Sequence, residues 1–76
     1  MKVKTRKYRE DEYDSSNIKS STFNMTTNVM DVKFKSGDKY RYFNVSEDIY
    51  ERFANSDSQG KFFIANIKSI FDYKKL

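Results

Sequence analysis

One short segment of the chain carries residue types that bind anions. Ser58, Gly60 and Lys61 stand together at the predicted start of a helix. Backbone amides at a helix start lack partners and lie at the positive end of the helix dipole, and glycine lets a ligand approach them closely. The segment therefore predicts a site for the phosphate of a nucleotide or of a phosphorylated small molecule. Because the glycine-rich stretch of a Walker loop is missing, the alternative is that Ser58 only caps the helix and Gly60 serves packing.

A second group of residues mixes cations with aromatic rings around a predicted hairpin. Unpaired bases stack on such rings, each contributing about 1 to 3 kcal/mol, while lysine and arginine hold the phosphate backbone. The group therefore predicts a nucleic-acid-binding surface, with RNA favoured. Its members are Lys33, Lys35, Lys39, Tyr40, Arg41 and Tyr42, with Lys61 and Lys68 added if a helix lies nearby.

The register of this hairpin decides what the two tyrosines do. With a three-residue loop over residues 35–37, Tyr40 faces Val32 and Tyr42 faces Met30, which puts both rings on the core side. A two-residue turn reverses the parity, so that both rings stand outside as a binding platform. The sequence leaves both registers open.

Composition argues against catalysis. The 76 residues include no cysteine and no histidine, which removes the usual nucleophile and base pairs, the proton shuttle that works near neutral pH and most zinc sites. We therefore expect a protein that is not an enzyme and that needs no cofactor and no metal.

The charge balance gives a mild preference for a polyanion. Lysine and arginine number 15 against 11 acidic residues, a net charge of +4, which biases diffusion toward phosphates. The positive charges at the amino terminus are followed by no apolar run, as a secretory signal or a membrane span would require. We expect a cytoplasmic protein whose partner is nucleic acid or another protein.

The elements that would position these groups form one domain. Residues 1–14, a basic block followed by an acidic block, are predicted to be a charged, mobile tail whose cations could touch phosphate, with a short edge strand around residues 3–7 as the alternative. Residues 15–76 are predicted to form a single α+β domain, a small antiparallel sheet of three to four strands covered on one side by two short helices. Strands are predicted over 17–25, with an irregularity near Ser20, and over 30–34, 39–45 and 71–75, and helices begin at Ser46 and Ser58.

Five short motifs follow one another in the order of a known family. They are Phe34-Lys35-Ser36-Gly37, Tyr40-Arg41-Tyr42, the segment from Val45 to Tyr50, Ser58-Gln59-Gly60-Lys61-Phe62-Phe63 and Ile67-Lys68. This order resembles the KTSC domain, which is named for its occurrence at the carboxy terminus of some lysyl-tRNA synthetases and is also met as a free-standing bacterial or phage protein. The resemblance spans residues 15–73 and implies a compact, non-catalytic module that binds nucleic acid.

The sequence departs from the family pattern at four positions. Ser46 and Asp72 stand where the family usually has proline, Ile64 where it has asparagine and Lys68 where it has arginine. Lysine cannot make the planar, two-pronged hydrogen bonds of arginine. The resemblance therefore implies the fold more firmly than the ligand.

A rival interpretation is a protein-interaction factor, for example a phage or mobile-element inhibitor of a host protein complex. An exposed Phe43 or Phe62 beside the sheet edge would supply its anchor, since aromatic residues are common at interface hot spots.

Overall fold

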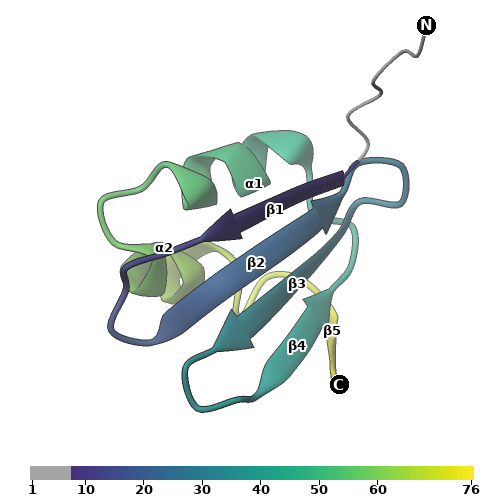
Figure 1. The fold of residues 1–76 in the computed structure, drawn as a ribbon. Coiled ribbons are helices and arrows are strands. Elements are labelled where there is room, and N and C mark those ends of the chain that lie inside the picture. Colours follow the sequence, from purple (N-terminus) through teal and green to yellow (C-terminus); the bar gives the residue numbers. More distant parts are fainter. Residues whose placement is uncertain (1–7) are drawn as a thin grey trace, which may run out of the picture.

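The computed structural model describes residues 8–76, which form a five-stranded antiparallel sheet and two helices. The strand order is β1-β2-β3-β4-β5, and both helices lie on one face of the sheet (Figure 1). The α+β class and the one-sided cover are as predicted, whereas the sheet has five strands instead of three to four. The elements are β1 (Tyr8–Glu12), β2 (Ile18–Asn24), β3 (Val29–Phe34), β4 (Lys39–Tyr42), α1 (Glu47–Ala54), α2 (Gln59–Asn66) and β5 (Tyr73–Lys75).

Strand β1 accounts for the difference. The sequence predicts a mobile tail over residues 1–14, yet β1 pairs with β2 from Tyr8 opposite Asn24 to Glu12 opposite Ser20. The ordered domain therefore begins before residue 15. The alternative strand around residues 3–7, and the cations of that segment, lie outside the described residues.

The side chains of β1 explain why its sequence does not look like a strand. Its residues on the helix side of the sheet are polar and find polar partners there. A guanidinium nitrogen of Arg9 lies 2.8 Å from a carboxylate oxygen of Glu51 on α1. The hydroxyl of Tyr50, also on α1, donates to Asp11 at 2.8 Å. The strand is therefore held by charge and hydrogen bonds instead of the apolar alternation that marks a half-buried strand.

The hairpin between β3 and β4 adopts the first of the two predicted registers. Tyr40 pairs with Val32 and Tyr42 pairs with Met30. Gly37 has a φ of 101°, in the left-handed region that favours glycine. Both tyrosines consequently lie on the helix side of the sheet. The predicted irregularity in β2 is also confirmed, because the register shifts between Ile18 and Ser20.

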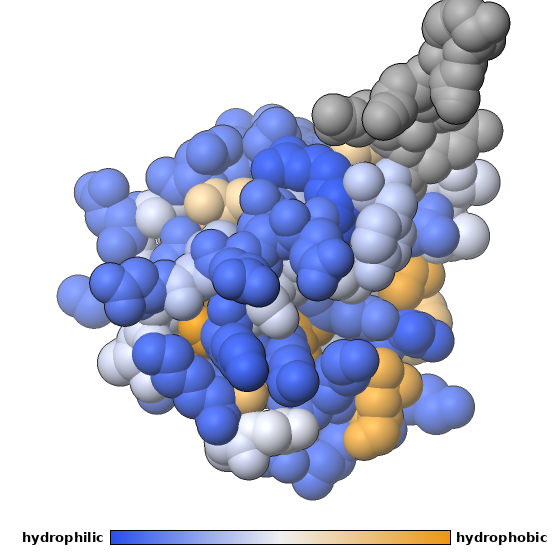
Figure 2. All heavy atoms as spheres, viewed as in Figure 1, coloured by the Kyte–Doolittle hydropathy of each residue, from blue (hydrophilic) through white to orange (hydrophobic). Residues whose placement is uncertain are grey.

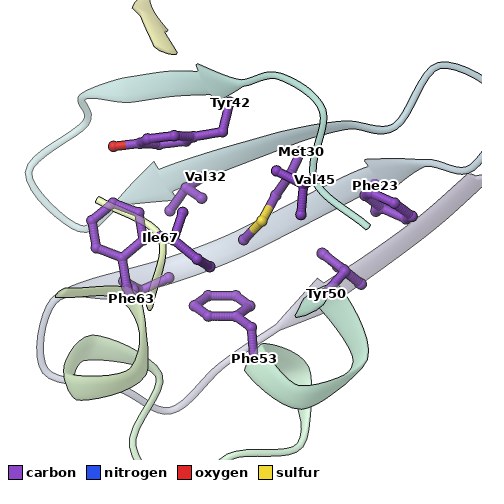
Figure 3. Packing of buried hydrophobic residues seen from close by; sticks show 10 residues of the cluster. Phe23, Met30, Val32, Tyr42, Val45, Tyr50, Phe53, Phe63 and Ile67 are labelled. Atoms are coloured by element: carbon purple, nitrogen blue, oxygen red, sulfur yellow. The ribbon is translucent and has the colours of Figure 1, made fainter. Parts of the chain in front are cut away.

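Both helices begin where the sequence predicts. Ser46 caps α1 by accepting a hydrogen bond from the amide of Ile49 at 3.1 Å, and the flanking Val45 and Tyr50 are fully buried, as a hydrophobic staple requires. The buried cluster between the helices and the sheet, drawn in Figure 3, has Tyr42 and Phe63 at one end and Phe23 and Tyr50 at the other. Its members are Ile18, Phe23, Met30, Val32, Tyr42, Val45, Tyr50, Phe53, Phe63 and Ile67.

Within residues 8–76, no helix has both the length and the apolar character needed to cross a membrane.

Candidate nucleic-acid interface

A groove of about 580 Å³ opens at the end of the core that Tyr42 and Phe63 occupy. Its walls come from the β3–β4 hairpin, from α2 with the turn that follows it, and from β5. We call it the aromatic groove. It is lined by Ser16, Asn17, Ile18, Phe34, Lys35, Ser36, Asp38, Tyr40, Tyr42, Gly60, Phe63, Ile64, Lys68, Ser69 and Tyr73.

Packed rings form the floor of the aromatic groove. The ring centroids of Phe34 and Tyr40 lie 5.8 Å apart, and those of Phe34 and Phe63 5.5 Å apart, both edge to face. Tyr42 meets Phe63 at 5.4 Å in the same geometry, which aromatic pairs favour. These contacts pack the rings of the floor against the core.

Tyr42 belongs to the floor and is only 3% exposed. Burial, with smaller contributions from the hydroxyls of Tyr73 and Tyr40, raises the pKa of Tyr42 to about 12. Its hydroxyl therefore stays neutral at physiological pH. Tyr42 is thus a core residue that borders the groove, and little of its ring is free to stack on a ligand.

Tyr73 is the ring that the groove leaves open. It stands on β5, opposite Tyr42 in register, and is 57% exposed. Its centroid lies 5.5 Å from that of Tyr42 and 5.8 Å from that of Tyr40. Ile64, 61% exposed, lines the groove from α2. The groove thus offers accessible apolar surface on two walls.

Two lysines border the groove from different walls. Lys35 follows β3, and its backbone amide donates to the carbonyl of Asn17 at 2.8 Å. Lys68 follows α2, and its amide donates to the carbonyl of Phe63 at 2.8 Å. Both backbones are therefore fixed while both side chains are exposed. The groove therefore has a lysine on each of two walls.

The structure divides the surface predicted from the sequence. Lys35, Tyr40, Tyr42, Lys68 and also Gly60 meet in the aromatic groove. Lys33 and Arg41 pair with Lys39 and Asp31 across β3 and β4 and alternate with the tyrosines, so they lie on the opposite face of the sheet.

Arg41 is already engaged on that opposite face. Its Nε donates to Asp31 Oδ1 at 2.8 Å and its Nη2 to Asp31 Oδ2 at 3.0 Å. The hydrogen-bonded carboxylate raises the pKa of Arg41. A two-pronged pair of this kind competes with a phosphate for the guanidinium.

The start of α2 has the geometry of an ordinary cap. Ser58 Oγ accepts from the backbone amide of Lys61 at 3.3 Å. The hollow of about 320 Å³ that Ser58, Gly60 and Lys61 border is also lined by Asp14 and Asp57. Two carboxylates oppose the binding of an anion there. These observations favour the capping role, and the phosphate site stays a prediction.

The two aromatic anchors of the rival interpretation are half-buried. Phe62 packs against the core, with its ring 6.3 Å from that of Phe53. Phe43 lines a hollow of about 400 Å³ on the face away from the helices, together with Tyr8 and Val29. A protein-binding role for this hollow stays a prediction.

Sequence reasoning named Ile64 only as a departure from the family pattern and missed several other side chains of the aromatic groove: Phe34, Asp38, Phe63 and Tyr73. One signal could have found Tyr73. The predicted last strand over residues 71–75 puts Tyr73 on the same side of the sheet as Phe71 and Lys75, and the structure pairs this strand with β4, opposite Tyr42. The contribution of α2 carried no such signal, because helix packing against the sheet end cannot be read from residue spacing.

In the part of the chain that the structure describes, no group of three or more acidic side chains is placed to hold a metal ion.

Comparison with known proteins defines the family of this chain. Residues 14–71 match the model of the KTSC domain, and the chain therefore belongs to the KTSC domain family. A crystal structure of a KTSC domain protein from Yersinia pestis superposes with a TM-score of 0.86 at 26% sequence identity, covering 91% of this chain and 97% of the other.

Two curated relatives are lysine–tRNA ligases from Trichormus variabilis and Nostoc sp.. Each is 35% identical over 63 residues, which is 83% of this chain but 11% of the ligase. The chain thus resembles a small part of each enzyme. Two of the four positions named above as departures from the family pattern, Ile64 and Lys68, line the aromatic groove.

Proposed function

We propose that this protein is a non-catalytic module that binds single-stranded nucleic acid, with RNA favoured, in the aromatic groove. The observation that carries the proposal is the exposed ring of Tyr73 beside Tyr40, in a groove that Lys35 and Lys68 also line. Base stacking on an aromatic ring, combined with cations along the backbone path, is the usual means of binding single strands.

The size and chemistry of the groove suit a nucleotide. Its volume of about 580 Å³ falls within the range of about 300 to 1,000 Å³ that is common for small-ligand sites. A base inserted beside Tyr73 and Ile64 would cover apolar surface that is now open to solvent. Lys35 and Lys68, which line the same groove, would supply cations for the phosphates next to that base.

The opposite face of the sheet is less suited to this task. Figure 2, viewed as in Figure 1 with the sheet in front of α2, shows a surface that is largely hydrophilic. On that face Arg41 forms an ion pair with Asp31, and the ring of Phe43 is half-buried. The ring of Tyr8 is exposed on that face, but the hollow that it lines with Arg41 also holds the carboxylate of Asp31, which opposes the approach of a phosphate.

RNA is favoured over DNA because of the relatives. The two ligases that share 35% identity with this chain are named for a tRNA substrate. Single-stranded segments are the RNA regions whose bases can leave the stack and enter a protein pocket.

A fluorescence-anisotropy titration of a short labelled single-stranded RNA tests the proposal. We expect affinity to fall with added salt, with each lysine contact contributing about 0.7 to the slope of log K against log salt. The double variant Lys35→Gln/Lys68→Gln should bind more weakly, and its slope of log K against log salt should be smaller by about two such contributions. Tyr73→Ala should weaken binding by about 1 to 3 kcal/mol, the value of one stacked base.

The matched control is Lys39→Gln/Lys74→Gln, which removes the same charge from exposed positions on the opposite face. Circular dichroism would verify that every variant is folded. Equal loss of affinity in both double variants would contradict the groove and indicate a general charge effect. Absence of RNA binding even at low salt would overturn the proposal in favour of a protein partner.

A further inference from the structure

Asp38 is the one carboxylate among the described residues that line the aromatic groove. It stands in the turn between β3 and β4, on the same wall as Lys35 and Ser36. A carboxylate in a groove proposed for a polyanion opposes the phosphate backbone. The carboxylate is better suited to accept hydrogen bonds from a nucleobase than to contact the phosphate backbone.

The carboxylate is held in place but keeps capacity for a ligand. Ser36 Oγ donates to Asp38 Oδ2 at 3.2 Å, and Lys75 Nζ lies 3.8 Å from Oδ1. Both members of the ion pair are more than half exposed, so their attraction is weak and does not block a second donor. Two carboxylate oxygens accept about four hydrogen bonds, which leaves room for N–H groups of a ligand.

A base that lies against Tyr40 and Tyr73 brings its hydrogen-bonding edge toward the walls of the groove. Lys75 Nζ is 6.0 Å from the centroid of the Tyr40 ring as well as close to Asp38. The aromatic surface and the carboxylate are therefore neighbours at one end of the groove. A base whose hydrogen-bonding edge reaches this end of the groove meets the Asp38 carboxylate, which accepts hydrogen bonds and donates none.

Nucleobases differ sharply in what they offer to a carboxylate. The Watson–Crick edge of guanine presents N1–H and N2–H side by side, which match the two carboxylate oxygens. Adenine and cytosine each offer one amino group, and a carboxylate accepts from such groups. Uracil offers a single N–H between two carbonyl oxygens, whose lone pairs repel a carboxylate.

From this arrangement we infer that the aromatic groove selects an unpaired guanine through Asp38, accepts adenine and cytosine less well, and takes uracil least well. This inference rests on the proposed function and adds base preference to it. Lys35 and Lys68 provide affinity that is independent of the base, and Asp38 provides the discrimination. Ser36 and Lys75 act as positioning residues for the carboxylate.

The test uses oligouridine strands in which one central uridine is replaced by guanosine, adenosine, cytidine or inosine, titrated by fluorescence anisotropy. A single guanosine in a uridine background avoids quadruplex formation. We expect the guanosine strand to bind about five- to tenfold more tightly than the all-uridine strand, the lower part of the range for a bidentate base contact. Inosine, which lacks the N2 amino group, should lose most of that advantage.

Asp38→Asn should bring the guanosine and uridine strands to within about twofold of each other, since an amide both donates and accepts. Asp48→Asn is the matched control, because it makes the same change at an exposed position on α1. The inosine comparison uses the unmodified protein and so does not depend on the folding of a variant.

Each outcome separates the two proposals. Equal affinity for all strands, or a guanosine preference that survives in Asp38→Asn, would overturn the inference while the RNA-binding module stands. Loss of binding to every strand at low salt would overturn the proposed function itself. A guanosine preference that falls with inosine and with Asp38→Asn supports both.

Discussion

Among single residues, Tyr50 joins three parts of the fold. It is fully buried on α1, and its ring stacks on Phe23 of β2 with centroids 4.8 Å apart. Its hydroxyl donates to Asp11 at 2.8 Å and lies 2.8 Å from Ser21 Oγ. Because a hydroxyl has one hydrogen, Ser21 must donate to Tyr50, and Tyr13, 2.8 Å from Ser21 Oγ, must donate to Ser21. This chain of hydrogen bonds links β1 and β2 to α1.

Tyr50→Phe should therefore destabilise the protein while the core stays filled. The change removes the acceptor for the hydrogen of the buried Ser21 hydroxyl, which still accepts from Tyr13, and removes one of the two donors to Asp11, which keeps Arg9. An unsatisfied buried donor costs about 1 to 3 kcal/mol of unfolding free energy. Urea denaturation followed by circular dichroism measures the loss. Tyr8→Phe is the control: Tyr8 is exposed and should change stability by no more than about 0.5 kcal/mol. Equal free energies of unfolding for the two variants would contradict the stabilising role of the hydrogen bonds made by Tyr50.

At the level of secondary structure, how well a strand or helix is predicted depends on the forces that hold it. The alternation of Met30, Val32 and Phe34 predicts β3, and the serine caps predict α1 and α2, because these signals arise from local burial and local hydrogen bonds. Strand β1 gives no apolar signal, since Arg9 and Asp11 depend on partners on α1, about 40 residues away in the sequence. The aromatic groove is not predicted from the sequence for a similar reason. Lys35 and Lys68 meet only because α2 packs at the end of the sheet.

The start of α2 provides a test of whether Ser58 caps the helix or binds phosphate. Ser58→Ala should lower the unfolding free energy by about 0.5 to 2 kcal/mol, the usual value of an N-cap, and leave the affinity for RNA unchanged. Ser46→Ala is the control, because it removes the equivalent cap of α1, which does not line the groove. A fall in RNA affinity with Ser58→Ala but not with Ser46→Ala, both folded, would instead support a phosphate site at Ser58, Gly60 and Lys61.

In the molecule as a whole, charge and apolar surface are divided between the two faces of the sheet. The helix side carries the core and, at one end, the aromatic groove with its two lysines. The other face is largely hydrophilic (Figure 2), and its arginine is paired with Asp31. A ligand that needs both stacking and positive charge finds Tyr73 and two lysines in the groove, whereas the exposed Tyr8 on the other face shares its hollow with Arg41 and the paired Asp31. The net charge of +4 would draw nucleic acid toward the molecule without choosing a face.

A titration of the isotopically labelled protein with single-stranded RNA, followed by the backbone amide NMR spectrum, tests this account most directly. The account predicts that the largest shifts fall on amides of the aromatic groove, around Lys35, Asp38, Ile64, Lys68 and Tyr73, and that α1 and the opposite face of the sheet change little. Shifts centred on Arg41 and Phe43, or shifts spread evenly over all exposed lysines, would contradict it.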